Sequence, residues 1–137
     1  MILLGIDFGD RRMGLAVCDK DERMAVSIGA VSVRGARHAA QKAAETARER
    51  KAEKIIVGMP FRADGFRGER CEKTEVFLSF LKELLDVAVE TVDESFTTTE
   101  AHSLLFGTGL AGKKHIRGVD ALSAQLILQS YLDKNRS

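Results

Sequence analysis

Acidic residues at the expected ends of strands and helices are the clearest sign of chemistry in this sequence. Asp7 lies in the first expected strand, and Asp93 and Glu94 end the fifth. Asp120 begins the last expected helix. Carboxylates that share a small volume repel one another, and a hard divalent cation such as Mg²⁺ or Mn²⁺ removes that conflict. Two such ions about 4 Å apart also hold the attacking and leaving oxygens of a phosphodiester displacement, so the set predicts metal-dependent phosphodiester chemistry.

Asp7 is the acidic residue that is hardest to explain structurally. The opening stretch ILLGIDFGD has the two-residue period of a strand, with one uniformly apolar face. An ionised carboxylate in a central strand is costly unless a cation or a hydrogen-bond donor answers it. Gly5 and Gly9, on either side of Asp7, leave space for an ion or a phosphate.

The other acidic residues each have a simple alternative explanation. Near a helix N-terminus, Asp120 would stabilise the helix dipole. Asp93 and Glu94 could mark a solvated strand end. Asp93 could also replace Glu94 as a ligand, because a slip of one residue reverses the face of a strand. The metal hypothesis therefore rests on the whole set rather than on one member.

Changes in apolar periodicity indicate the elements that must position these residues. Strands are expected at residues 2–8, 13–19, 24–33, 54–60 and 87–92. Helices are expected at about 36–47, 76–85, 98–106 and 119–133, with a flexible glycine-rich loop at 107–118. The first three strands have short polar connections and form an antiparallel meander, and the last two follow helices and run parallel. This order predicts one α/β domain whose five-stranded mixed sheet is flanked by helices, with the first strand beside the parallel ones.

Composition excludes several classes of protein. The chain has 137 residues, 45% of them hydrophobic. No apolar run approaches the roughly 18 residues that span a membrane. No basic leader precedes the first strand, so a cytoplasmic protein is expected. Cys18 and Cys71 lie far apart and outside any metal-binding motif, which favours reduced thiols and leaves a disulfide open.

Net charge argues against extensive nucleic-acid binding, so any such function must come from a local patch. Lys and Arg number 21 against 20 Asp and Glu, for a net charge of +1. The best candidate is the loop at 107–118, which contains Lys113, Lys114, His115 and Arg117 and no acidic residue. Beside a metal site these cations could hold the phosphates that flank the scissile bond, and an ordinary solvated loop is the alternative. His115 is a poor general base, because a flexible loop positions it badly.

The motifs of this chain resemble those of the YqgF/RuvX family, the Holliday-junction-resolvase-like proteins with an RNase H-like fold. GIDFGDRRMGLAVCD resembles the opening motif, GMPFRADG the Gly-Leu-Pro loop, DESFTTTEA the Asp-Glu-Arg-Leu-Thr-Thr motif and GVDALSAQLILQSYLD the C-terminal helix. The resemblance implies a single RNase H-like nuclease domain over residues 1–137. It implies a Mg²⁺- or Mn²⁺-dependent endonuclease that matures the 5′ end of pre-16S rRNA, with ribosomal precursor particles as partners. A resolvase of branched DNA is the alternative within the family.

The resemblance also implies roles for individual residues. The family's acidic triad falls on Asp7, Glu94 and Asp120, as metal ligands and catalytic residues. The expected nucleic-acid contacts are Arg12, which matches a basic position of the family, and Lys113, Lys114 and Arg117. Two positions depart from the family pattern, with Ser95 in place of an Arg and Asp10 in place of a small hydroxyl residue.

Two further classes of function remain open. A non-catalytic nucleic-acid-binding factor, acting in transcription or ribosome assembly, is compatible with the near-neutral charge and with Ser95. Such a factor would keep binding nucleic acid after Asp7→Asn and would not cleave it with any metal. The stretch GIDFG also resembles the phosphate loop of sugar kinases and actin-like ATPases, but those proteins need two such domains around the nucleotide. A literal DER at residues 21–23 is expected to be a solvated hairpin turn.

Overall fold

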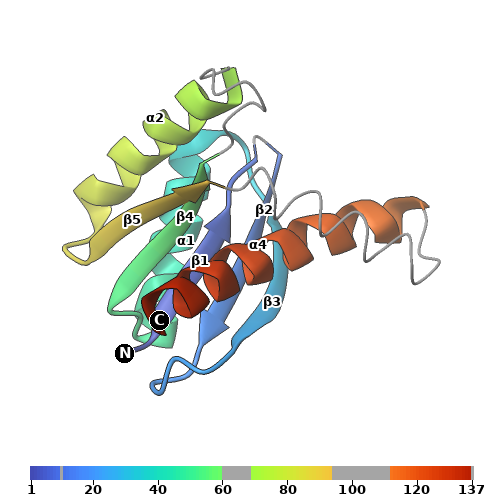
Figure 1. The fold of residues 1–137 in the computed structure, drawn as a ribbon. Helices are drawn as coiled ribbons and strands as arrows, with labels where there is room; N and C mark the ends of the chain where they lie inside the picture. The colour runs from blue at the N-terminus through green and yellow to red at the C-terminus, as the bar shows by residue number, and fades with distance from the viewer. Residues whose placement is uncertain (10, 60–68, 94–111, 137) are drawn as a thin grey trace.

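A five-stranded mixed sheet forms the centre of the protein in this computed structural model (Figure 1). The structure describes residues 1–9, 11–59, 69–93 and 112–136. The strands are β1 (Leu3–Asp7), β2 (Arg12–Cys18), β3 (Ala25–Ser32), β4 (Lys54–Met59) and β5 (Ala88–Asp93). The helices are α1 (Ala36–Arg50), α2 (Glu69–Leu84) and α4 (Gly112–Arg136).

The strand order confirms the predicted topology. The order is β3-β2-β1-β4-β5, so β1 is the central strand. It pairs antiparallel with β2 and parallel with β4. The short β1–β2 and β2–β3 connections permit only antiparallel pairing, whereas α1 and α2 supply the crossovers that parallel pairing requires.

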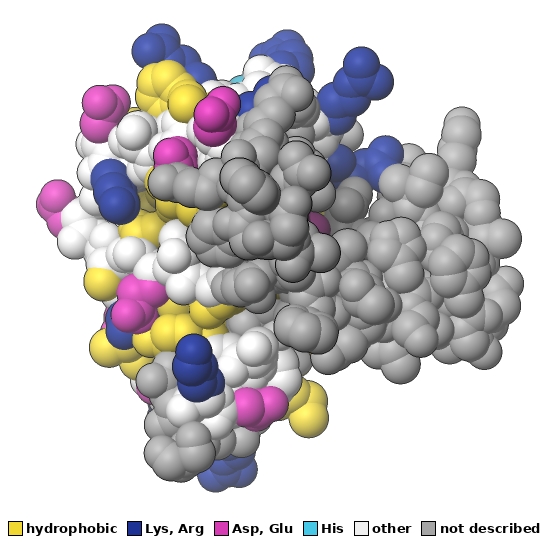
Figure 2. Space-filling model, turned by 45° about the horizontal axis from the view of Figure 1, so that its top comes forward, with side chains coloured by type: hydrophobic (Ala, Val, Ile, Leu, Met, Phe, Trp, Pro, Cys, Tyr) yellow, Lys and Arg dark blue, Asp and Glu magenta, His cyan; other side chains and the backbone are white. Residues whose placement is uncertain are grey.

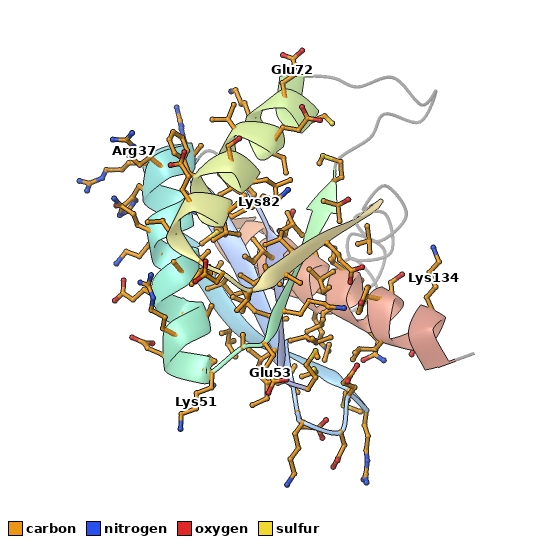
Figure 3. All side chains as sticks on the ribbon, turned by 90° about the vertical axis from the view of Figure 1, so that its left-hand side faces the viewer. Arg37, Lys51, Glu53, Glu72, Lys82 and Lys134 are labelled. Carbon is orange, nitrogen blue, oxygen red and sulfur yellow. The ribbon has the colours of Figure 1, made fainter. Side chains whose placement is uncertain are left out.

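The two faces of the sheet carry different helices. Leu4, Ile6 and Phe8 belong to the core that lies against α1 and α2. Leu3, one residue out of phase with them, belongs to the core that lies against α4. Figure 3 shows this division, with α1 and α2 on one side of the strands and α4 on the other. The buried side of α1 is a stripe of small residues, which lets that helix lie close to the sheet. These residues are Ala39, Ala40, Ala43, Ala44 and Ala47.

Gly5 is the point at which α4 packs most closely on β1. A Cβ atom at Gly5 would lie 2.7 Å from the Leu128 Cβ and 3.2 Å from the Ala124 carbonyl oxygen. Both distances are shorter than ordinary carbon contacts. Glycine is therefore required in the middle of the central strand so that the helix backbone can approach.

Polar contacts hold the C-terminal half of α4 to both edges of the sheet. On one side the Lys54 ammonium lies 3.0 Å from the Tyr131 hydroxyl and 3.0 Å from the Glu90 carboxylate, and the Tyr131 hydroxyl donates to Glu90. On the other side the backbone N–H of Ala25, in the edge strand β3, donates to Gln129 Oε1 at 2.8 Å. The hydrogen bonds of Tyr131 and Lys54 lower the pKa of Glu90, and those of Tyr131 and Glu90 raise the pKa of Lys54.

The start of the last helix differs from the prediction. α4 begins at Gly112 rather than at residue 119, so residues 112–118 are helical and not part of a loop. The sequence GKKHIRG contains no proline, and a glycine within a helix costs only about 1 kcal/mol relative to alanine. The predicted helix at 98–106 lies outside the described residues, as does Pro60.

The two cysteines are both free and buried. Cys18 lies in the core beneath α4 and Cys71 in the core beneath α1 and α2, so the sheet separates them and the disulfide left open from the sequence does not form. Burial raises the pKa of the Cys18 thiol, and its Sγ accepts a hydrogen bond from the backbone N–H of Leu3 at 3.3 Å.

Within the described residues, no helix is both long enough and apolar enough to cross a membrane.

We predict that Gly5→Ala destabilises the protein by about 1–3 kcal/mol, because the added methyl group must displace Leu128 or the α4 backbone. Urea-induced unfolding of the two proteins measures the difference. An unchanged midpoint would contradict the close approach of α4 to β1.

Glu90→Gln should lower the free energy of unfolding at pH 7 by at most about 1 kcal/mol, because both charges of the pair are partly exposed. The carboxyl of Glu90 has a lowered pKa in the folded protein, so its stabilisation is present above its ordinary value of 4.5 and is lost as the pH falls through the folded value. The difference between wild type and variant should therefore shrink in unfolding curves taken below pH 4.5. A difference that grows on acidification would contradict this assignment.

Candidate metal and nucleic-acid site

Asp7 ends the central strand and is buried, with 8% of its surface exposed. It is in phase with Leu3 and Gly5, so it belongs to the face of the sheet that α4 covers. The sequence prediction that a carboxylate would stand in a buried central strand is therefore confirmed.

Glycines surround Asp7 on this face of the sheet. In β2 it pairs with Gly14. In β4 its neighbour is Gly58, which follows the registered pair Ile6–Val57. Gly5 precedes it by two residues, and Gly9 follows at a point where a Cβ atom would lie 2.6 Å from the Arg12 carbonyl oxygen. Gly14 and Gly58 therefore place no side chain beside Asp7 from the adjoining strands, whereas the space beside Gly5 is taken by α4 and that beside Gly9 by the Arg12 backbone.

The packing of α4 brings Asp120 to the same side of the molecule. At the start of β1, Lys54 is registered with Leu3 and contacts Tyr131 of α4. Further along β1, Gly5 lies against Ala124 and Leu128. α4 therefore runs roughly opposite to β1, with its N-terminal half toward the end of β1 at Asp7. Asp120 precedes Ala124 by four residues, about 6 Å of helix. Asp7 follows Gly5 by two residues, about 7 Å of strand. Asp7 and Asp120 thus lie at similar distances beyond the contact at Gly5 and in the same direction, although α4 crosses the strands obliquely (Figure 1).

The position of Asp120 removes one of its alternative explanations. It lies more than two turns inside α4, which begins at Gly112. A helix dipole acts on charges within about the first turn, so Asp120 is not placed to stabilise this one.

Strand alternation assigns position 93, the last residue of β5, to one face of the sheet. Glu90 contacts α4 through Tyr131, and Val92 packs against the core beneath α4. Val89 packs against the opposite core. Position 93, in phase with Val89, therefore belongs to the face away from Asp7. Glu94 lies outside the described residues, and no group of three possible metal-ligating side chains occurs among the residues that the structure does describe.

The predicted phosphate contacts come from two elements. Arg12 begins β2, is half-buried, and is in phase with Ala16 and Cys18 of the core beneath α4, so it shares the face and the sheet end of Asp7. Lys113, Lys114 and Arg117 lie in the first two turns of α4, not in a flexible loop. Positions 113, 117 and 120 follow the four- and three-residue spacing that places residues on one face of a helix.

Sequence reasoning missed the lateral glycines of the site. Gly14 and Gly58 become neighbours of Asp7 only through strand register, which no local pattern in the sequence reveals. The DER at 21–23 is correctly excluded, because it lies in the turn between β2 and β3, where Arg23 pairs with Asp21 at 3.8 Å on the surface.

Comparisons with known proteins show what the whole chain is similar to. A family model described as "RuvX: Holliday junction resolvase" matches residues 1–134. A protein of Syntrophus aciditrophicus named "Putative pre-16S rRNA nuclease" is 39% identical over 133 residues, which cover 97% of this chain and 89% of that protein. A protein of the same name from Halothermothrix orenii is 35% identical, with coverage of 97% and 95%.

Solved structures support the predicted fold class. Thermus thermophilus RuvC superposes with a TM-score of 0.59 at 18% identity, over 99% of this chain and 97% of that one. The fowlpox virus resolvase, solved with substrate Holliday junction DNA, gives a TM-score of 0.63 at 12% identity over all of both chains. These likenesses confirm the RNase H-like fold. The match of the family model over residues 1–134 shows that the chain belongs to the RuvX (Holliday junction resolvase) family.

Proposed function

We propose that this protein is a metal-dependent endonuclease that hydrolyses phosphodiester bonds in pre-16S rRNA. The observation that carries the proposal is Asp7, a buried carboxylate on the α4 face of the central strand with glycines around it. A buried carboxylate at the end of a central strand offers oxygen ligands to a hard divalent cation, and such an ion would offset part of the cost of burying its charge.

The donor chemistry fits Mg²⁺ or Mn²⁺. Both ions prefer carboxylate oxygens, which are the donors that Asp7, Glu94 and Asp120 would supply. Asp7, Glu94 and Asp120 would hold one or two ions, and these would supply an activated water and neutralise charge on the scissile phosphate. Glu94 is preferred to Asp93, because a shared ligand must come from the α4 face and position 93 belongs to the other.

The basic residues would position the substrate backbone. Arg12 stands beside the acidic site on the same face of the sheet, where its guanidinium could bind a phosphate oxygen next to the scissile bond. Lys113, Lys114 and Arg117 would continue this contact along the start of α4. Phosphate contacts fix the register of the strand but read no sequence, so specificity would come from the shape of the RNA.

The choice of pre-16S rRNA rests on the more similar relatives. The proteins named for that substrate are 39% and 35% identical to this chain over nearly its whole length. Cleavage of a four-way DNA junction is the second candidate, because the family model carries the description of a Holliday junction resolvase. Cutting two strands of a junction in concert would require a symmetric dimer, whereas cleavage of one RNA strand would not.

We expect Asp7→Asn to reduce cleavage of a labelled pre-16S rRNA leader fragment by about a thousandfold or more, because a lost metal ligand removes several kcal/mol of transition-state stabilisation. Cleavage is measured with Mg²⁺, with Mn²⁺ and with EDTA, on the RNA and on a four-way DNA junction. Nucleic-acid binding that persists while wild type cuts neither substrate with either metal would favour the non-catalytic binding factor.

Glu94→Gln and Asp93→Asn form a matched pair on adjacent residues. Glu94→Gln should abolish cleavage. Asp93→Asn should leave cleavage within about threefold of wild type, because position 93 belongs to the face of the sheet opposite to that of Asp7. Loss of cleavage in Asp93→Asn alone would show that the face assignment at the end of β5 is wrong.

A further inference from the structure

A second group of basic residues lies outside the set assigned to the cleavage site. Residues 24–44 contain no Asp or Glu, but they contain Arg34, Arg37 and Lys42. Residues 11–18 likewise contain Arg11 and Arg12 and no acidic residue, although Asp10 directly precedes them. In a chain whose net charge is only +1, two such segments make a local excess of positive charge wherever they meet.

Strand pairing brings these two segments together at one end of the sheet. Arg12 is registered with Ser32 at the end of β3. The backbone N–H of Val33 donates to the carbonyl oxygen of Arg11 at 2.9 Å, so Val33 lies opposite Arg11, and Arg34 is the next residue along the chain. This is the end of β2 and β3 that adjoins the end of β1 at Asp7.

Arg37 extends the group onto the first turn of α1, which contains no acidic residue. Its guanidinium carbon lies 5.1 Å from the centre of the Phe80 ring, which supports the side chain while it remains exposed. Figure 3 shows Arg37 pointing outward from the start of α1. In Figure 2, Lys and Arg side chains stand along the upper rim of the molecule.

We propose that Arg11, Arg34 and Arg37 form an arginine ridge that binds the phosphate backbone of the nucleic-acid substrate beyond the scissile bond. The ridge begins beside Arg12 and crosses the end of the sheet toward α1. Neighbouring strands lie about 4.8 Å apart, so the end of β3 is about 10 Å from the end of β1. A nucleic-acid strand carries one phosphate per roughly 3.4 Å of helix axis, so the ridge would engage a few nucleotides beyond the cleavage site.

This inference rests on the proposed function, because the ridge is argued to serve the strand held at Asp7. Its position at the same end of the sheet as Arg12 distinguishes it from a scattered surface charge. Arg11 precedes β2, Arg34 follows β3 and Arg37 lies in the first turn of α1, and all three are exposed. A flexible polyanion can bend to reach all three guanidinium groups. If the ridge bound an acidic protein partner instead, its arginines would not contribute to the salt dependence of RNA binding.

The test measures the salt dependence of RNA binding in the Asp7→Asn background, where cleavage is suppressed. Fluorescence anisotropy of a labelled pre-16S rRNA leader fragment is recorded at several KCl concentrations for this protein and for Arg34→Ala/Arg37→Ala in the same background. The matched control is Arg50→Ala/Lys82→Ala, which removes two exposed charges near the C-terminal ends of α1 and α2. Circular dichroism checks folding, and Arg34→Lys/Arg37→Lys retains the charge.

We expect the ridge variant to bind several-fold more weakly and its log–log salt slope to fall by about 1.4–1.8, since each lost phosphate contact contributes about 0.7–0.9. The lysine variant and the control should keep the slope of the parent protein. An unchanged slope in the ridge variant, or an equal fall in the control, would overturn the ridge and leave the proposed nuclease intact. Failure of the parent protein to bind the RNA at any salt concentration would overturn both.

Discussion

The close contact of α4 with Gly5 is the constraint on which the candidate site depends. β1 is central in the sheet, and its backbone is open at Gly5 to the approach of Leu128 and the Ala124 carbonyl. Any larger residue at this position would push the helix outward and change its position over the end of the strand. The contact therefore fixes both how far Asp120 lies from the sheet and how far along β1 it lies. Tyr131 and Gln129 reinforce the same register from the two edges.

Glycine also determines what the end of β1 can do. At Gly14 and Gly58, beside Asp7 on the adjoining strands, the sheet carries no side chain, although each missing side chain costs buried apolar area. That loss is tolerable because the rest of the sheet is densely filled, with an apolar core on each face. Such a local exception to good packing is typical of a functional site in an otherwise consistent fold.

Much of the fold follows from local patterns in the sequence. The strand periods, the helix at about residues 36–47 and the buried carboxylate at Asp7 are all properties of a few consecutive residues, and the structure confirms them. The start of α4 was predicted wrongly, because two glycines flanking a basic stretch look like a loop although they interrupt a helix only weakly. Gly14, Gly58 and the pairing of Arg11 with Val33 could not be predicted, because they arise from pairing between strands.

Mn²⁺ binding measured by isothermal titration calorimetry, without nucleic acid, tests most directly whether α4 and β1 together build a metal site. The comparison covers wild type, Asp7→Asn, Asp120→Asn and the double variant. If both carboxylates hold the same ion, each single variant loses most of the binding, and the double variant binds no more weakly than the weaker single one. If Asp120→Asn binds Mn²⁺ like wild type, or if the two losses simply add, Asp7 and Asp120 do not share an ion and the account of the site is wrong.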